Sequence, residues 1–335
     1  MTDRSNAPTS SSLDGLNARA PTGGQWQVVH GEQRLVIVEV GGGIRSYSAR
    51  GRDVIYGYPA EEMCSAGRGQ VLMPWPNRVG DGRYEFGGRQ QQLALSEPEH
   101  SNAIHGLVRW VPWSARVVAA DRVVLVYDLL PQPGYPYFLE LSIEYQLAED
   151  GLRVRTTARN SGPRPCPFGS GAHPYLTAGT AVVDDSLLRA PGSTVLLSDD
   201  RGIPEGQQPV DDTEFDFRRP RPIGSLRLDH CFTDLVRDRD GLARVELAAP
   251  GDDAGAVLWM DAAYTHLMLF TGDPLPQIER RSLAVEPMTC PPDAFRSGIG
   301  VVTLEPGGSW VGEWGITPRK GQRTGEPGAS AHAGV

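Results

Sequence analysis

The stretch YFLELSIEYQLAEDGLRVRTTARN, residues 137–160, decides the fold class. Apolar and polar residues alternate through its first half and again through its second half, which is the period of a β-strand with one buried face. Between the halves stands AEDG, residues 148–151, a typical hairpin turn in which the final glycine accepts a positive φ. The stretch therefore predicts an antiparallel β-hairpin.

Other short runs along the chain have the same β-character, being alternating or β-branched and bounded by Gly, Pro, Asp or Asn. They cover residues 33–40, 122–130, 256–262, 266–272 and 309–316. The chain holds 40 glycines and 28 prolines in 335 residues, so few windows can form a long amphipathic helix. We expect an all-β fold, a large antiparallel β-sandwich with few short helices.

The two ends of the chain differ in composition from the rest. Residues 1–23 and 319–335 are rich in Ser, Pro, Gly and Ala and contain almost no large apolar side chain. Such segments bury too little surface to offset their ordering entropy, so we expect disordered tails there. The tract between them, residues 24–318, has no internal repeat and no linker-like break, which favours a single domain.

Composition excludes several classes of protein. The net charge is −9 without a long basic run, which argues against a nucleic-acid partner. The sequence has no uninterrupted apolar stretch of 18 residues, so no membrane span is expected. The polar N-terminus lacks a secretory signal, so a cytoplasmic location is expected. Lys320 is the only lysine, and it lies in the polar C-terminal stretch. Schiff-base chemistry needs a desolvated lysine and is therefore excluded.

The sequence gives little sign of a metal or a cofactor. The four cysteines are scattered without a C-x-x-C pair and are interpreted as reduced, mostly buried thiols: Cys64, Cys166, Cys231 and Cys290. His100 and His105 stand five residues apart without identifiable further ligands. We therefore expect neither a catalytic metal nor a bound cofactor.

Two histidines lie in unusually constrained surroundings. His173 occurs in FGSGAHPYLTAG, residues 168–179, and His105 precedes Gly106 where a loop enters an apolar strand. Pro174 restricts the backbone of the residue before it. A fixed imidazole with a pKa near its ordinary value of about 6.5 can exchange a proton near neutrality. Each histidine can equally be a core residue bonded to a backbone carbonyl.

Acidic and basic candidates stand beside prolines. Glu286 ends an apolar run just before Pro287, and a desolvated carboxylate there suits a general base. The pair Asn77–Arg78 follows two prolines, and its guanidinium can offer several donors to a polyhydroxylated ligand. The alternatives are a solvated strand-end glutamate and an arginine that bonds loop carbonyls. Asp229, at a strand start in RLDHCFTDL, indicates little by itself.

In this order, the segments resemble the aldose 1-epimerase (galactose mutarotase) family. The motifs are P-x-x-N-R-x-x-x-G-x-[YF] at 74–84, HG at 105–106, G-x-H-P-Y at 171–175, DHCFTDL at 229–235 and E-P-x-x-x-P-P-D-A at 286–294. The sequences of these motifs are most similar to those of a bacterial branch of YihR-like epimerases. The resemblance covers roughly residues 25–317 and implies a β-sandwich of the galactose mutarotase type.

The resemblance also implies an activity, the cofactor-free interconversion of the α and β anomers of a free aldose by an isomerase. Glu286 would take the proton of the C1 hydroxyl. His173 would protonate the ring oxygen, and His105 would share that acid role.

The remaining residues of the motifs would bind the sugar. Arg78 and Asp229 would hold sugar hydroxyls, and Asn77 would orient Arg78 or its loop. Tyr175, in the G-x-H-P-Y motif, is counted with the sugar-binding residues.

Alternatives remain for the function. The same fold can serve a non-catalytic sugar-binding or sensor protein, and Glu286 with Asp229 can be the carboxylate pair of a glycoside hydrolase. Pro287 and Met288 depart from the better-known family members, which leaves the sugar open. A neutral hexose such as glucose or galactose, a sulfo-sugar and a hexose 6-phosphate are all candidates, and Arg109 keeps the phosphate possible. The resemblance leaves monomer and homodimer undecided.

Overall fold

The structure is a computed structural model that describes residues 19–251 and 254–319. Most of both expected tails, residues 1–18 and 320–335, lies outside the described residues. Residues 19–23 are described and contact the sandwich. Thr22 is buried, and its carbonyl accepts a hydrogen bond from the Val40 N–H at 3.0 Å.

The hairpin expected from residues 137–160 is confirmed. Strand β12 (Leu139–Ala148) pairs with β13 (Gly151–Asn160) in unbroken antiparallel register, from Leu139 opposite Asn160 to Ala148 opposite Gly151. Alternate residues of β12 are buried, as the sequence pattern predicts. Ala148 and Gly151 form the last pair of the register, so the turn lies between them.

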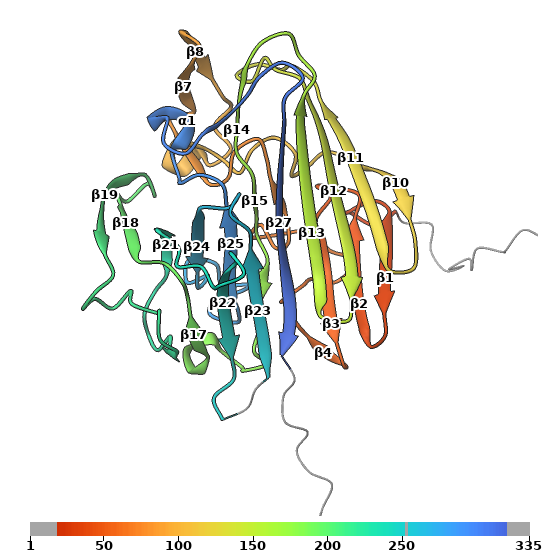
Figure 1. The fold of residues 1–335 in the computed structure, drawn as a ribbon, viewed down its shortest axis with the longest axis vertical. Coiled ribbons are helices and arrows are strands. Elements are labelled where there is room, and N and C mark those ends of the chain that lie inside the picture. Colours follow the sequence, from red (N-terminus) through yellow and green to blue (C-terminus); the bar gives the residue numbers. More distant parts are fainter. Residues whose placement is uncertain (1–18, 252–253, 320–335) are drawn as a thin grey trace, which may run out of the picture.

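This hairpin is part of a nine-stranded antiparallel sheet. Figure 1 shows β10, β11, β12, β13 and β27 side by side in it. Its strands in spatial order are β10 (Ser114–Val118), β11 (Arg122–Leu129), β12, β13, β27 (Ser309–Arg319), β23 (Gly255–Met260), β22 (Ala243–Ala248), β17 (Leu187–Arg189) and β20 (Arg221–Pro222). Its outer face carries ion pairs such as Arg155–Glu313 and Arg159–Glu140, so that face is solvated.

A second sheet of eight strands packs beside the first. Its strands in spatial order are β19 (Pro204–Pro209), β18 (Thr194–Ser198), β21 (Asp229–Thr233), β24 (His266–Phe270), β25 (Leu283–Met288), β15 (Gly171–Ala172) and β5 (Val71–Leu72), with β16 (Tyr175–Leu176) also paired to β25. All of these pairs are antiparallel. The large hydrophobic core is built from residues of both sheets.

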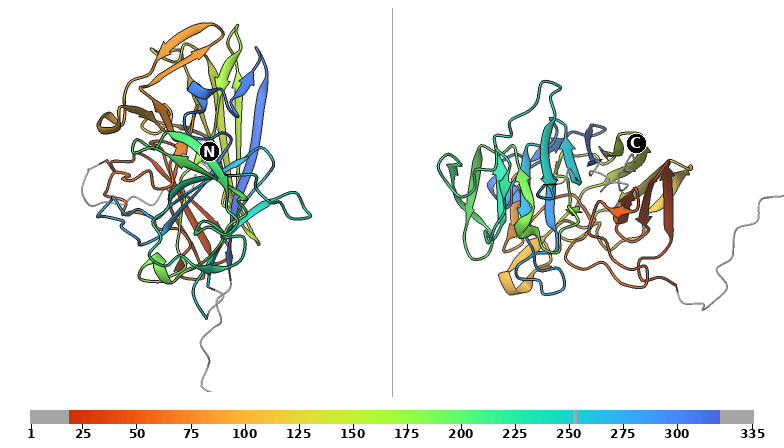
Figure 2. Two further views of the ribbon diagram at one scale, coloured as in Figure 1. Left: turned by 90° about the vertical axis from the view of Figure 1, so that its left-hand side faces the viewer. Right: turned by 90° about the horizontal axis from the view of Figure 1, so that it is seen from below.

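Smaller strands complete the sandwich. A four-stranded sheet holds β1 (Gln25–His30), β2 (Gln33–Val38), β3 (Ile44–Ala49) and β4 (Arg52–Asp53), at the opposite side of the molecule from β18 and β19 (Figures 1 and 2). The two-stranded pairs are β6 (Arg78–Gly80) with β9 (Asn102–Ile104), β7 (Arg83–Phe86) with β8 (Arg89–Gln92), and β14 (Cys166–Phe168) with β26 (Val302–Leu304).

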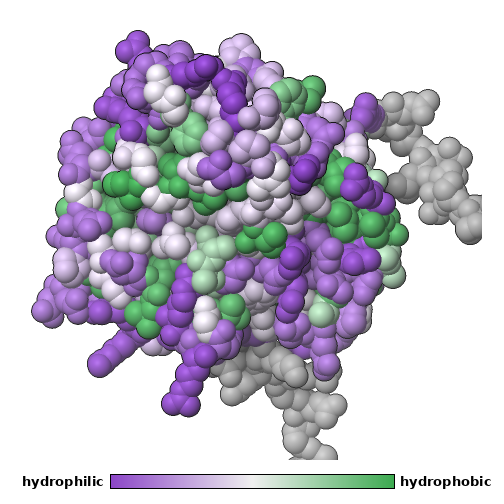
Figure 3. All heavy atoms as spheres, turned by 45° about the horizontal axis from the view of Figure 1, so that its top comes forward, coloured by the Kyte–Doolittle hydropathy of each residue, from purple (hydrophilic) through white to green (hydrophobic). Residues whose placement is uncertain are grey.

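Helical structure is scarce, which confirms the all-β prediction. The described part of the chain has one α-helix, α1 (Ala294–Ser297), and two 3₁₀ turns, η1 (Pro98–His100) and η2 (Val183–Asp185). Among these residues no helix is long and apolar enough to cross a membrane. All four cysteines are buried and free. The face in Figure 3 is mainly polar, with apolar side chains in small separate groups.

Candidate active site

The pairing of the eight-stranded sheet brings His173 to Glu286. Strands β15 and β16 both pair with β25 in one continuous register, so His173, which lies between them, stands directly opposite Glu286. Pro174 has no N–H to donate, but its carbonyl accepts the N–H of Val285 at 3.0 Å and keeps the strands together. The motif G-x-H-P-Y therefore places an imidazole against a carboxylate.

These two side chains touch in the interior. His173 Nε2 lies 3.3 Å from Glu286 Oε1, and both residues are at most 5% exposed. Burial raises the pKa of Glu286 well above its ordinary value and lowers the pKa of His173 to about 3. The other atoms of the pair, Glu286 Oε2 and His173 Nδ1, have no hydrogen-bond partner among the described residues. Buried polar atoms are normally paired, and a catalytic role is one explanation of an exception.

The His173 ring is held from two sides. Tyr175 stacks on it at 13° with ring centroids 5.0 Å apart, and the Tyr175 hydroxyl donates to the Ala66 carbonyl at 2.8 Å. Gly67 lies so close that a Cβ there would be 2.8 Å from His173 Cδ2. The Gly69 N–H donates to the His173 carbonyl at 2.9 Å. Tyr175 therefore supports the imidazole, and its hydroxyl, which donates to Ala66, keeps its acceptor capacity for the sugar that it is predicted to bind.

His105 and Asn77 fix each other. The Asn77 N–H donates to His105 Nδ1 at 3.1 Å, and the His105 N–H donates to the Asn77 carbonyl at 2.8 Å. Both residues have positive φ, 62° and 54°, which costs a non-glycine residue about 1–2 kcal/mol each. Because Nδ1 accepts a backbone proton, the neutral ring carries its own proton on Nε2.

His105 is also electrostatically coupled to its neighbours. Its ring meets that of His173 edge to face, with centroids 5.4 Å apart. Burial lowers the pKa of His105 well below its ordinary value, and the positive charges of Arg109 and Arg78 lower it further. The ring is therefore a neutral donor through Nε2–H at physiological pH.

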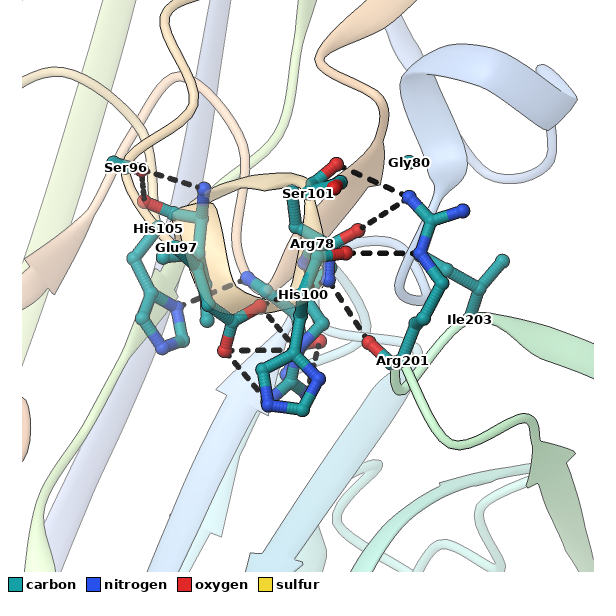
Figure 4. A network of polar contacts seen from close by, with 12 residues as sticks. Arg78, Gly80, Ser96, Glu97, His100, Ser101, His105, Arg201 and Ile203 are labelled. Atoms are coloured by element: carbon teal, nitrogen blue, oxygen red, sulfur yellow. Dashed lines mark hydrogen bonds and ion pairs between the residues drawn. The ribbon is translucent and has the colours of Figure 1, made fainter.

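Arg78 binds Glu97 through part of its guanidinium, and its remaining N–H groups have no close partner among the described residues (Figure 4). Its Nε and Nη2 bind the Glu97 carboxylate at 2.9 and 3.1 Å, and Asn77 Oδ1 accepts the Arg78 backbone N–H at 3.1 Å. Burial alone would lower the pKa of Arg78, but the bonds to Glu97 outweigh it and raise the pKa. Asn77 therefore orients Arg78, while Nη1 has only a 3.5 Å contact to Asn77 Oδ1. Its N–H groups can serve a ligand.

Asp229 lies on the same face of the sheet. Cys231, Met268 and Glu286 stand opposite one another across β21, β24 and β25, so Asp229, two residues before Cys231, shares their face. Protein atoms crowd its carboxyl and raise its pKa, although the residue is accessible to solvent, a combination expected in a concave site. The Asp229 charge also raises the pKa of Glu286.

A cavity of about 390 Å³ adjoins this face and is lined in part by Asp229 and Phe270. Two cavities of about 340 and 320 Å³ lie around Arg50 and Pro318 and contain none of the seven candidate residues. Asp229 is the one candidate residue that lines the cavity of about 390 Å³, so the chemistry of the side chains, more than a cavity, identifies the site. Among the described residues, no group of His, Cys, Asp and Glu is arranged to bind a metal ion.

Two charged neighbours of the site are not among the predicted site residues, although Arg109 was named from the sequence as keeping a phosphorylated sugar possible. Glu97, in a loop without a recognisable motif, anchors Arg78. Arg109 lies where its charge lowers the pKa of both His105 and His173. Its guanidinium lies over the Trp110 ring, 5.9 Å from the centroid, and donates to Gln70 Oε1 and the Ile104 carbonyl at 3.4 Å each, but it pairs with no described carboxylate. Its position four residues after His105 was the only available signal.

Comparisons with known proteins agree with this geometry. The family model described as aldose 1-epimerase matches residues 25–317. The uncharacterized protein YihR of Escherichia coli K12 is 34% identical over 278 residues, which is 83% of this chain and 87% of that protein. Galactose mutarotase of Mus musculus is 27% identical over 202 residues, which is 55% of this chain and 57% of that protein.

Solved structures share the fold. The crystal structure of a putative aldose 1-epimerase from Escherichia coli K12 superposes with a TM-score of 0.74 at 21% identity, covering 88% of this chain and 98% of that one. Galactose 1-epimerase from Lactobacillus acidophilus superposes with a TM-score of 0.72 at 21% identity, covering 85% and 91%. The predicted galactose mutarotase-like sandwich is confirmed.

Proposed function

The chain belongs to the aldose 1-epimerase family, and from this premise we propose that it interconverts the α and β anomers of a free aldose. The family makes it an isomerase-type enzyme of carbohydrates. The observation that carries the proposal is the buried contact between His173 Nε2 and Glu286 Oε1. It pairs a proton acceptor with a proton donor, and no group of the described residues satisfies Glu286 Oε2 or His173 Nδ1.

Ring opening needs two proton transfers, one at each of the two oxygens that are bonded to C1. Glu286 accepts the proton of the C1 hydroxyl, the bond from C1 to the ring oxygen breaks, and its electron pair stays on that oxygen. His173 gives the ring oxygen a proton, and C1 becomes an aldehyde. Both oxygens are bonded to C1, so adjacent atoms such as Oε1 and Nε2 suit them. Rotation about C1–C2 and the reverse transfers close the ring as the other anomer.

The resting pair holds the proton that this reaction needs. A raised pKa of Glu286 and a lowered pKa of His173 favour a neutral carboxyl beside a neutral imidazole. Transfer of that proton across their contact gives a carboxylate and an imidazolium, the base and the acid of the ring-opening step. The pair returns to its starting state after each turnover, so no cofactor is consumed.

Three further residues would bind the sugar. His105 would donate Nε2–H near the ring oxygen, and Arg78 and Asp229 would hold hydroxyls away from C1. His105 Nδ1 accepts the Asn77 N–H, whereas His173 Nε2 contacts the Glu286 carboxyl that can give it a proton, and this difference supports a hydrogen-bonding role for His105. Positioned acid–base transfer contributes roughly 10²–10⁴-fold to a rate, and holding the ring contributes the rest.

Arg109 favours a second candidate, a mutarotase for an anionic sugar such as a sulfo-sugar or a hexose 6-phosphate. Its guanidinium is largely desolvated, and burial lowers its pKa. It has no carboxylate partner among residues 19–251 and 254–319, and its two side-chain hydrogen bonds are long, at 3.4 Å. A sulfonate or phosphate would supply the missing negative charge.

The rival functions fit the site less well. A glycoside hydrolase would use Glu286 with Asp229 as acid and nucleophile or base. Glu286 instead contacts His173, and His105 would have no task in that mechanism. A protein that only binds sugar has no need of a buried carboxyl with a raised pKa, because burying it costs stability.

Polarimetry tests the proposal. Freshly dissolved α anomers of glucose, galactose, a hexose 6-phosphate and a sulfo-sugar are followed with and without the protein. At least one should reach its equilibrium rotation faster with the protein, and faster equilibration of the charged sugars alone would favour the Arg109 alternative. The proposal fails if no sugar is accelerated, and release of sugar from an aryl glycoside would favour the hydrolase.

A further inference from the structure

The turn between β18 and β19, residues 199–203, is rigid and reaches toward Arg78. The Asp199 carboxylate accepts the backbone N–H groups of Arg201 and Ile203 at 2.9 and 2.8 Å. The Gly202 N–H donates to the Asp199 carbonyl at 2.9 Å. These bonds give the turn one shape, so the residues at its tip have a defined direction.

Arg201 fastens this turn to residues 100–102 (Figure 4). Its Nε donates to the His100 carbonyl at 2.9 Å, and its Nη2 donates to the Ser101 carbonyl at 3.1 Å and to Asp81 Oδ1 at 2.8 Å. The backbone carbonyl of Arg201 accepts Asn102 Nδ2 at 2.9 Å. The turn and the loop therefore hold each other through side chain and backbone.

Asn102 connects the turn to Glu97, because its side-chain amide binds both. It is fully buried, and its amide has two N–H groups. One binds the Arg201 carbonyl and the other binds Glu97 Oε2 at 2.8 Å. Backbone bonds between Glu97 and Asn102 run in both directions, at 3.0 and 3.1 Å. The carboxylate that holds Arg78 is thus itself held by the turn.

Gly202 confines Arg78 directly. A Cβ at Gly202 would lie 2.6 Å from Arg78 Nη1 and 2.8 Å from its Cζ. The guanidinium has little freedom to retreat, because Glu97 binds its Nε and Nη2. The Glu97 carboxylate and the glycine of the turn therefore fix where the Nη1 donors point.

We propose that Arg201 is a positioning residue for the sugar, because through Asn102 and Glu97 it determines where Arg78 presents its free N–H groups. The proposal rests on the proposed function, since Arg78 binds hydroxyls that do not react. Loss of such binding weakens the ground state and the transition state equally, so it raises KM and leaves kcat unchanged.

Arg201→Met and Gly202→Ala test the proposal. The first removes the side-chain bonds that hold the Arg201 carbonyl against Asn102, and the second pushes on Arg78 Nη1 while keeping Arg201. Each should raise KM roughly five- to tenfold, the loss expected from one misaligned charge-assisted hydrogen bond, with kcat within about twofold of the wild type. Arg244→Met is the matched control, because Arg244, like Arg201, binds carboxylate on the surface, here Asp238 and Asp240, but lies in the nine-stranded sheet.

A second measurement is independent of activity. The Nε–H proton of Arg78, identified by its loss in Arg78→Lys, should exchange faster with water in Arg201→Met than in Arg244→Met. Equal KM and equal exchange rates in Arg201→Met and Arg244→Met would overturn the proposal, as would a fall in kcat at unchanged KM. If the wild type accelerates no sugar, the proposed function fails, while the exchange rate still decides whether Arg201 positions Arg78. If Arg201→Met does not fold, Gly202→Ala decides by the same two measurements.

Discussion

Gly67→Ala should lower kcat because it displaces the His173 imidazole. The new Cβ would stand 2.8 Å from His173 Cδ2 and 3.1 Å from Nε2, whereas ordinary contacts begin near 3.4 Å. Tyr175 stacks on the ring and limits its movement, so the imidazole must shift by about 0.6 Å. A misplacement of about 1 Å can cost 10²-fold in rate, so we expect kcat to fall by roughly 10- to 100-fold.

Gly51→Ala is the matched control for this change. Gly67 and Gly51 have nearly the same left-handed backbone, φ 71° and 73°, so alanine at either position costs about 1–2 kcal/mol of folding free energy. A Cβ at Gly51 would meet no atom within 4 Å. The two variants should therefore lose similar stability, and only one should lose activity.

The assay combines thermal unfolding with the rate of anomer equilibration for an accepted sugar. We expect both variants to show nearly equal decreases in Tm, with kcat close to wild type in Gly51→Ala alone. Equal kcat in the two variants would refute the claim that the loop at Gly67 sets the position of the catalytic imidazole.

Three further predictions concern the charges and supports of the site. Activity should fall as pH rises through the raised pKa of Glu286, because the pair then lacks the proton that it gives to the ring oxygen. Asp229→Asn should move this limb of a pH–rate profile to lower pH, because the Asp229 charge raises that pKa. An unmoved limb would contradict the coupling. Burial favours the protonated form of Glu286, so its pKa is higher in the folded protein than in the unfolded chain. Its contribution to the free energy of unfolding is therefore fully present below the pKa of the unfolded chain and is lost as pH rises through the pKa of the folded protein. Thermal unfolding of Glu286→Gln should accordingly show a Tm advantage over the wild type that grows with pH and reaches at least about 2 °C at pH 8. Tyr175→Phe should lower kcat about two- to fivefold, because the lost hydroxyl bonds Ala66 and holds the ring that stacks on His173; an unchanged kcat in steady-state kinetics would contradict this support, and a raised KM would indicate the predicted contact with the sugar.

The strand pattern could be predicted from the sequence because its signal is local. The hairpin of β12 and β13 has the expected register, since alternation and a turn fix it within 24 residues. The pairing of β15 and β16 with β25 joins residues more than 100 positions apart. No local pattern encodes such a contact, so the sequence could name His173 and Glu286 but not show that they touch.

The supporting residues were harder to predict because their roles depend on the fold. Glu97 stands in a loop where any acidic residue would look solvated, and only the β6–β9 pairing brings that loop to Arg78. Arg201 lies about 100 residues from the loop that it holds. Tyr175 was placed among the sugar ligands by its motif, and the structure adds the backbone partner of its hydroxyl. Motifs identify chemically active residues better than the contacts that orient them.

The most direct test of the account is anomer exchange at equilibrium, measured by two-dimensional exchange NMR on one accepted aldose with the wild type and with Glu286→Gln. The account predicts cross-peaks between the α and β anomers at micromolar wild-type enzyme. In the variant the exchange rate should be roughly 10²–10⁴-fold lower, with the fold retained. Exchange at the wild-type rate in Glu286→Gln would contradict the claim that the buried carboxylate opposite His173 performs the proton transfer.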